Sequence, residues 1–89
     1  MRRDAEFFGE AELDLVYMAR RLNDALGLED ALTSAGVDYL VETGTYTAGI
    51  MMKRELTGAF FYVAPKDVEN TRLVLTRTDR KPYKAEDEG

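Results

Sequence analysis

A run of threonine and glycine near the middle of the chain is the first pattern that could bind a ligand. The letters GTYTAG are followed closely by two cations. Backbone N–H groups in a glycine-containing turn can surround an anion, and nearby cations add to the attraction. The residues of this candidate anion site are Thr45, Thr47, Gly49, Lys53 and Arg54. The plainer interpretation, which the missing P-loop spacing favours, is a hairpin with strand threonines and solvated charges.

Chemistry that depends on cysteine or histidine is excluded, because the chain has neither residue. Thiolate catalysis, Ser-His and Cys-His nucleophiles and the usual zinc ligand sets are therefore ruled out. The carboxylates are neighbours along the predicted helices or tail, so they do not converge on a metal site or an acid–base pair. Ser34 has no base to activate it. We therefore expect a non-catalytic protein with no cofactor and no metal.

Four large apolar side chains are candidates for a subunit interface: Phe7, Phe8, Met51 and Met52. The phenylalanines lie in an otherwise polar N-terminal stretch, and the methionines follow Ile50. Methionine adapts to irregular apolar surfaces and is frequent at protein interfaces. Packing of residues 50–52 inside the domain core is an equally good interpretation.

Length and charge limit the partners. The chain has 89 residues and a net charge of −5. One domain of this size is only marginally stable alone, which favours a homo-oligomer. An acidic chain is a poor partner for nucleic acid, which requires a concentrated basic surface. No apolar run approaches the roughly 20 residues of a membrane span, and the N-terminus lacks the apolar part of a signal peptide. We therefore expect no membrane partner and a cytoplasmic location.

The first half of the chain predicts a strand, a helix and a second strand. Residues 13–19 form a strand that is apolar on both faces, which favours a central position in the sheet. In the helix that follows, Asn23 or Asp24 is expected to cap the start, and Gly36 to lie just beyond the end. The second strand covers residues 37–47. The expected apolar stripe of the helix comprises Ala25, Leu28, Ala31, Leu32 and Ala35.

The second half predicts a third strand at residues 59–64, which Pro65 ends. The segment before it, residues 48–58, is open between a long hairpin arm, a mobile loop and the start of that strand. A second helix follows Pro65, with an apolar stripe at Val68, Thr71 and Leu75, although the letters LVLT within it could equally form a strand.

The last residues, 79–89, are charged and predict a solvated tail. A short fourth strand around residues 81–83 is possible, but Pro82 would confine it to a sheet edge. The element order β-α-β-β-α, with a possible closing β, predicts an α+β fold of the ferredoxin-like kind. In that fold the helices lie on one face of a small mixed antiparallel sheet. We divide the chain into a flexible arm at 1–12, one domain at 13–78 and the tail at 79–89.

Two segments carry a resemblance to a known family: GLEDALTSAGVDYLVE and, after a spacer, AFFYVAPKDVENTRLVL. They resemble a family of small bacterial proteins described as signal transducing, a domain of unknown function grouped with the PII-like proteins. The resemblance covers roughly residues 13–76, and the chain departs from the family in its longer, methionine-containing spacer. It implies a ferredoxin-like fold. It also implies that the connection between the second and third strands, residues 43–58, meets ligands and partners.

The sequence therefore favours a small regulatory or ligand-sensing domain, PII-like and homo-oligomeric, with a small anionic ligand. One alternative is a protein–protein interaction module that has no small-molecule ligand and binds an unidentified protein. Another is an ACT-like domain, in which the helix start at residues 22–27 would bind the carboxylate of an amino acid. For that helix start, a simple N-cap is the plainer interpretation.

Overall fold

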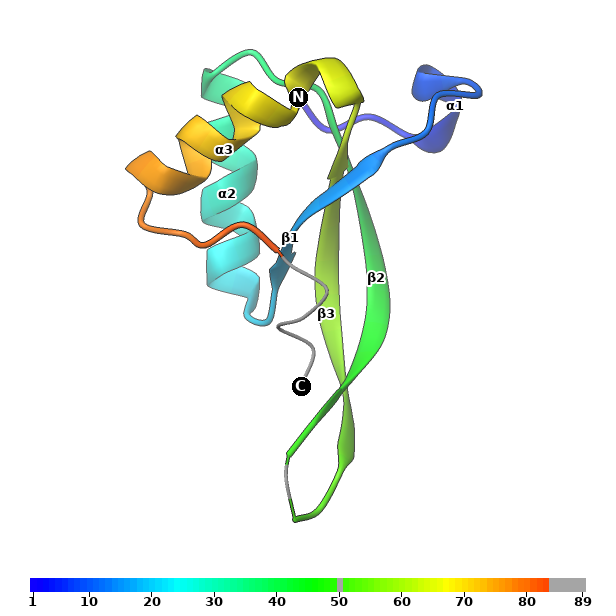
Figure 1. Cartoon of the computed structure of the whole chain (residues 1–89), viewed down its shortest axis with the longest axis vertical. Helices are drawn as coiled ribbons and strands as arrows, with labels where there is room; N and C mark the ends of the chain where they lie inside the picture. The colour runs from blue at the N-terminus through cyan, green and yellow to red at the C-terminus, as the bar shows by residue number, and fades with distance from the viewer. Residues whose placement is uncertain (50, 84–89) are drawn as a thin grey trace.

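The computed structural model describes residues 1–49 and 51–83 and shows a small α+β domain (Figure 1). In chain order its elements are α1 (Ala5–Phe8), β1 (Asp14–Ala19), α2 (Leu22–Ser34), β2 (Tyr39–Ala48), β3 (Arg54–Val63), the short 3-10 helix η1 (Pro65–Asp67) and α3 (Val68–Arg77). Within the described part of the chain, no helix has the length and apolar character needed to cross a membrane.

The three strands form one antiparallel sheet in the order β1-β3-β2. Among the described residues β3 lies in the middle and β1 at an edge, so the expected central position of β1 is wrong for this three-stranded sheet. The pairing of β1 with β3 shifts between Leu15 and Tyr17. The extra residue at this bulge breaks the strict alternation of side chains. Val16 and Ala19, three positions apart, are consequently both buried, so apolar residues in both alternating positions do not require a central strand.

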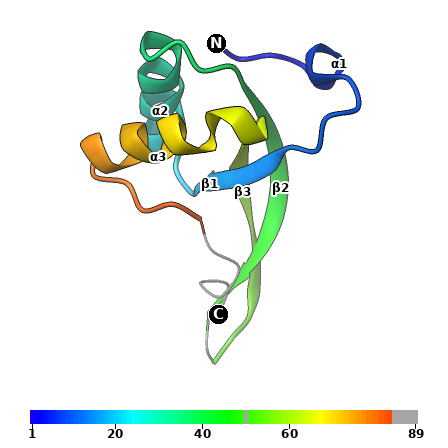
Figure 2. The ribbon, with the colours of Figure 1, turned by 45° about the horizontal axis from the view of Figure 1, so that its top comes forward.

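The core lies between the sheet and the two long helices, which cover the same face (Figures 1 and 2). Both predicted stripes point into it, except that Ala35 is exposed at the end of α2. The segment LVLT is helical, as part of α3. The fully buried side chains include Leu28, Leu32, Phe61, Val63, Thr71 and Leu75.

The two ends of α2 differ in how well the sequence predicted them. Gly36 has a φ of 75°, and the N–H of Val37 donates to the Leu32 carbonyl at 3.0 Å, so the predicted glycine stop is confirmed. The predicted N-cap is wrong. Arg21 occupies the cap position without a side-chain hydrogen bond, and Asp24 lies inside the first turn. Its carboxylate instead binds residues from other parts of the chain.

Residues 48–58 belong largely to a long hairpin, so the hairpin-arm interpretation is correct. β2 and β3 pair in unbroken register from Tyr39 with Val63 to Ala48 with Arg54. The hairpin projects beyond the helices at one end of the molecule (Figure 1). Gly44 and Gly58 lie opposite each other in this ladder, which leaves room for aromatic rings on the neighbouring strand.

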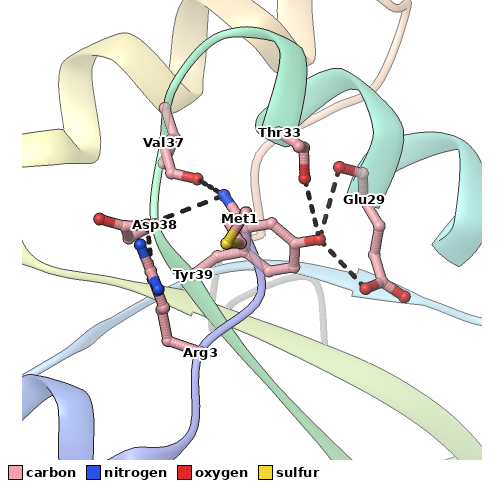
Figure 3. A network of polar contacts seen from close by, with 7 residues as sticks. All are labelled: Met1, Arg3, Glu29, Thr33, Val37, Asp38 and Tyr39. Atoms are coloured by element: carbon pink, nitrogen blue, oxygen red, sulfur yellow. Dashed lines mark hydrogen bonds and ion pairs between the residues drawn. The ribbon is translucent and has the colours of Figure 1, made fainter.

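The first three residues, expected to belong to a flexible arm, are docked against the start of β2. The N–H of Arg3 donates to the Tyr39 carbonyl at 2.8 Å, and the N–H of Tyr39 donates to the Met1 carbonyl at 3.1 Å. Figure 3 shows the side chains around this contact, including the Arg3 guanidinium on Asp38 at 2.9 Å. The docking combines backbone bonds with the ion pairs Arg3–Asp38 and Arg2–Glu29, and no sequence motif predicts it.

Candidate functional site

A groove of about 660 Å³ opens where the end of β1, the last part of β2 and the segment after α3 come together. Its charged lining residues are Arg20 and Lys81, and no aspartate or glutamate lines it among the described residues. Four aromatic side chains complete its character: Tyr17, Tyr46, Phe60 and Tyr83. We call this site the cationic groove. Its two positive side chains contrast with the net charge of −5 of the whole chain.

Arg20 enters the cationic groove from the residue that directly follows β1. Its guanidinium lies 5.3 Å from the centre of the Tyr46 ring, within the range of a cation–π contact. This contact joins the end of β1 to the last part of β2. A planar cation above an aromatic face can bind a carboxylate or phosphate while the ring contacts an apolar portion of the same ligand.

Residues 81–83, which line the cationic groove beside β1 and β2, are held in place by a contact that we call the Asp24–Arg80 latch. The Arg80 Nε donates to Asp24 Oδ1 at 2.7 Å, and Arg80 Nη2 donates to the Asp24 carbonyl at 3.3 Å. The hydroxyl of Tyr17 donates to the other carboxylate oxygen, Oδ2, at 2.6 Å. The Arg80 side chain is only 15% exposed. The latch therefore fixes the chain just before Lys81 reaches the groove.

A backbone bond completes the placement of this segment. The N–H of Tyr83 donates to the Val16 carbonyl at 2.8 Å, which brings residues 81–83 beside β1. In Figure 1 the segment after α3 returns across the molecule to β1. Residues 81–83 do not form the possible fourth strand. Among the described residues, the backbone bond from Tyr83 to Val16 is what joins this segment to β1.

Tyr17 stays a neutral phenol in this environment. Burial raises its pKa to about 12, and the hydrogen bond to Asp24 and the charge of that carboxylate act in the same direction, while Arg80 opposes them. The neutral hydroxyl is a hydrogen-bond donor at physiological pH. Tyr17 is accordingly suited to hold Asp24 in place and unsuited to act as a base.

The predicted anion site is divided by the structure. Thr45, Thr47 and Gly49 line the cationic groove, but Lys53 and Arg54 do not. Both cations are exposed, on the far side of the hairpin turn. Gly49 has a φ of 106°, and a Cβ there would collide with the Met52 carbonyl, so this glycine is required by the turn itself.

Sequence reasoning missed the two cations that line the groove. Arg20 stands directly after the predicted first strand, and Lys81 lies in the charged C-terminal region. The one available signal was that each is next to or within a predicted strand: Arg20 follows the strand at residues 13–19, and Lys81 lies in the possible strand at residues 81–83. Their convergence requires the twist of the hairpin and the Asp24–Arg80 latch, neither of which is visible as a motif.

The start of α2 gives no support to an ACT-like carboxylate site. The side chain of Asp24 stands in its first turn and is already bound by Tyr17 and Arg80. A carboxylate ligand at this helix start would face a like charge that is held in place.

The four predicted interface residues do not form one patch. Met51 and Met52 lie at the hairpin turn with 93% and 79% of their surface exposed, so neither packs in the core. Ile50 lies outside the described residues. Phe7 and Phe8 lie in α1, at the opposite end of the molecule (Figures 1 and 2), with their ring centroids 5.1 Å apart in an edge-to-face arrangement.

Taken together, the fold and the groove define a small α+β protein with a ligand-sized site of cationic and aromatic character. In the part of the chain that the structure describes, no group of three or more acidic side chains is arranged to hold a metal ion. Comparisons with protein-family models, with curated proteins and with solved structures found no match to this chain. The resemblance to the PII-like proteins therefore stays a prediction.

Proposed function

We propose that this chain is a small, non-catalytic ligand-sensing domain of the PII-like kind that binds an anionic small molecule in the cationic groove. The observation that carries the proposal is the pairing of Arg20 and Lys81 in a groove with four aromatic residues and no described acidic residue. Two cations at one concave site offer an anion a local attraction, although the net charge of the chain is −5.

The size and chemistry of the groove narrow the ligand class. A volume of about 660 Å³ falls within the range of small-molecule sites. The cations suit a carboxylate or a phosphate, and the rings of Tyr46 and Tyr83 suit a flat or apolar portion of the ligand. The hydroxyls of Thr45 and Thr47 can add hydrogen bonds. We therefore infer a ligand with an anionic end and an apolar or aromatic body.

The topology supports a ferredoxin-like fold for this domain. The antiparallel order β1-β3-β2, with both long helices on one face, matches three of the four strands of a ferredoxin-like sheet. A closing strand would lie on the outer side of β1, where Tyr83 already donates to Val16. We propose that the domain acts in the cytoplasm as a homo-oligomer, as expected for a sensor of this size.

Thermal-shift screening tests the proposal, with sugar phosphates, nucleotides, amino acids and dicarboxylates as probes and calorimetry on each hit. A ligand at 100 times its Kd should stabilise the fold by about 2.7 kcal/mol. Arg20→Gln and Lys81→Gln should each weaken binding about tenfold or more. Lys53→Gln, which removes an exposed cation outside the groove, is the matched control and should leave affinity unchanged. No stabilisation by any probe, or equal losses in all three variants, would refute the proposal.

A protein-interaction module is the second candidate, and the exposure of Met51 and Met52 at the projecting hairpin turn favours it. Two highly exposed methionines at the end of a projecting hairpin are suited to contact an apolar surface on another polypeptide. This candidate predicts no response in the ligand screen. It also predicts a partner whose capture is lost in a Met51→Ser, Met52→Ser double variant and kept in Arg20→Gln.

A further inference from the structure

The two edges of the sheet differ in how they are protected against pairing with another strand. β1 has six residues and a bulge at Val16, and the Val16 carbonyl accepts a hydrogen bond from the Tyr83 N–H. β2 has ten residues and an unbroken register with β3. Proteins protect exposed edges with lysine, proline, bulges or short strands, and β2 has none of these. Its single charged residue is Glu42.

The backbone of β2 shows which residues face this open edge. Both backbone groups of Tyr39 bind residues 1–3, on the side away from β3. In an antiparallel ladder the direction of the backbone groups alternates from residue to residue. The odd-numbered residues that follow therefore also direct their N–H and C=O groups outward: Val41, Thr43, Thr45 and Thr47. No backbone group elsewhere in the described part of the chain binds any of these four residues.

We propose that this edge pairs with the same edge of a second copy of the chain, antiparallel, about a two-fold axis at Gly44. This register follows from counting the free groups. Centring the axis on residue 44 places Thr43 opposite Thr45 and Val41 opposite Thr47 of the second copy, so every outward group of the four residues finds a partner. Centring it on residue 43 would require Tyr39, which residues 1–3 already occupy, and centring it on residue 45 would require Gly49, beyond the strand.

The side chains fit the same register. Gly44 faces Gly44 of the second copy in a non-hydrogen-bonded pair, where the Cα atoms come closest, so no two side chains crowd each other at the two-fold axis. Threonine faces threonine, a favourable cross-strand pair, and Glu42 faces Tyr46 rather than another carboxylate. The pairing forms about eight hydrogen bonds and joins two three-stranded sheets into one continuous sheet. We commit to a second copy because this edge is self-complementary: in the register centred on Gly44 the outward groups of the four residues satisfy one another, and no like charges face each other.

Cysteine cross-linking tests the register directly, because the native chain has no cysteine. Thr43→Cys and Thr45→Cys proteins are mixed and oxidised mildly. The mixed disulfide between positions 43 and 45 should form at least about tenfold faster than either symmetric disulfide, because only the directly opposed Cα atoms lie within disulfide reach. Faster symmetric cross-linking, or no cross-linking, overturns the proposed register.

The oligomeric state provides the second test, by light scattering on the whole chain. The wild type should be a dimer. Thr45→Pro removes one outward N–H and no bond to β3, so it should give a folded monomer by circular dichroism. Thr45→Val keeps the backbone donor and should stay dimeric. A monomeric wild type, or a dimer that persists in a folded Thr45→Pro protein, overturns the proposal. These readouts do not depend on ligand binding.

Discussion

Asp24 connects more of the structure than any sequence pattern around it suggests. Its carboxylate accepts hydrogen bonds from Tyr17 on β1 and from Arg80 beyond α3, which lies 56 positions away. The residue was expected to cap a helix, a role that depends on local backbone geometry. It takes a long-range role because Arg80 arrives from another element with a stronger, charge-assisted hydrogen bond.

Asp24→Asn should lower the free energy of unfolding by about 1–3 kcal/mol, because it leaves the mostly buried Arg80 without its counter-charge. Urea unfolding at neutral pH measures the change. The matched control is Glu69→Gln, which breaks the exposed Arg72–Glu69 pair. That pair should contribute less than about 0.5 kcal/mol. Equal effects of the two substitutions would contradict the role we assign to the latch.

Tyr17 should make stability depend on alkaline pH. Its pKa of about 12 in the folded chain exceeds the usual 10.0, so between these values the folded state holds the proton more tightly than the unfolded state. The contribution is complete below pH 10 and is lost as the pH rises toward about 12. Tyr17→Phe should flatten this decline in urea unfolding measured across the same range. In NMR, the wild-type Tyr17 ring should still report a neutral phenol at about pH 11; a phenolate signal there would disprove the assignment.

At the scale of elements, α3 is helical because one of its faces is buried, although its residues have a low helix propensity. Its sequence is rich in valine and threonine, and the letters LVLT suit a strand as well as a helix. The helical spacing nevertheless places Thr71, Val74 and Leu75 on one buried face. The hydroxyl of Thr71 is satisfied within the helix, at 2.8 Å from the Asp67 carbonyl. Burial of that face against α2 and the sheet decides the conformation.

Two leucines on α3 provide a matched test of this account. Leu75→Ala should destabilise the domain by about 2–5 kcal/mol, because Leu75 is fully buried. Leu73→Ala should change stability by less than about 0.5 kcal/mol, because Leu73 is 61% exposed. Chemical unfolding of both variants measures the difference. Similar losses would mean that α3 packs with a different face.

At the scale of the whole molecule, the four apolar residues that the sequence grouped as one interface lie far apart. The phenylalanines of α1 and the methionines of the hairpin lie at opposite ends of a molecule 41 Å long. They cannot form one interface patch within a single copy. The cationic groove is lined by Gly49 but not by Met51 or Met52, so the two proposed functions depend on different side chains. The ligand screen and the capture experiment can therefore separate the two proposed functions.

The assembly we propose also belongs to this scale. Pairing at β2 would use backbone groups of Thr45, while the same strand lines the cationic groove with side chains. The long edge, with Glu42 as its single charged residue, is a hazard for a monomer, and a symmetric partner removes it. A protein of 89 residues gains stability by burying such an edge.

The sequence by itself determined the α+β class, the β-α-β-β-α order, the glycine stop of α2 at Gly36 and the apolar stripes of both long helices. These features depend on periodicity and on backbone freedom, which are local properties. It also indicated Thr45, Thr47 and Gly49 as residues near a candidate site. Only the tertiary structure decided that β1 lies at an edge of the described sheet, because strand order depends on long-range pairing and not on the alternation of side chains. Only the fold brought Arg20 and Lys81 to those threonines, because hairpin twist and the Asp24–Arg80 latch act across long separations in the chain.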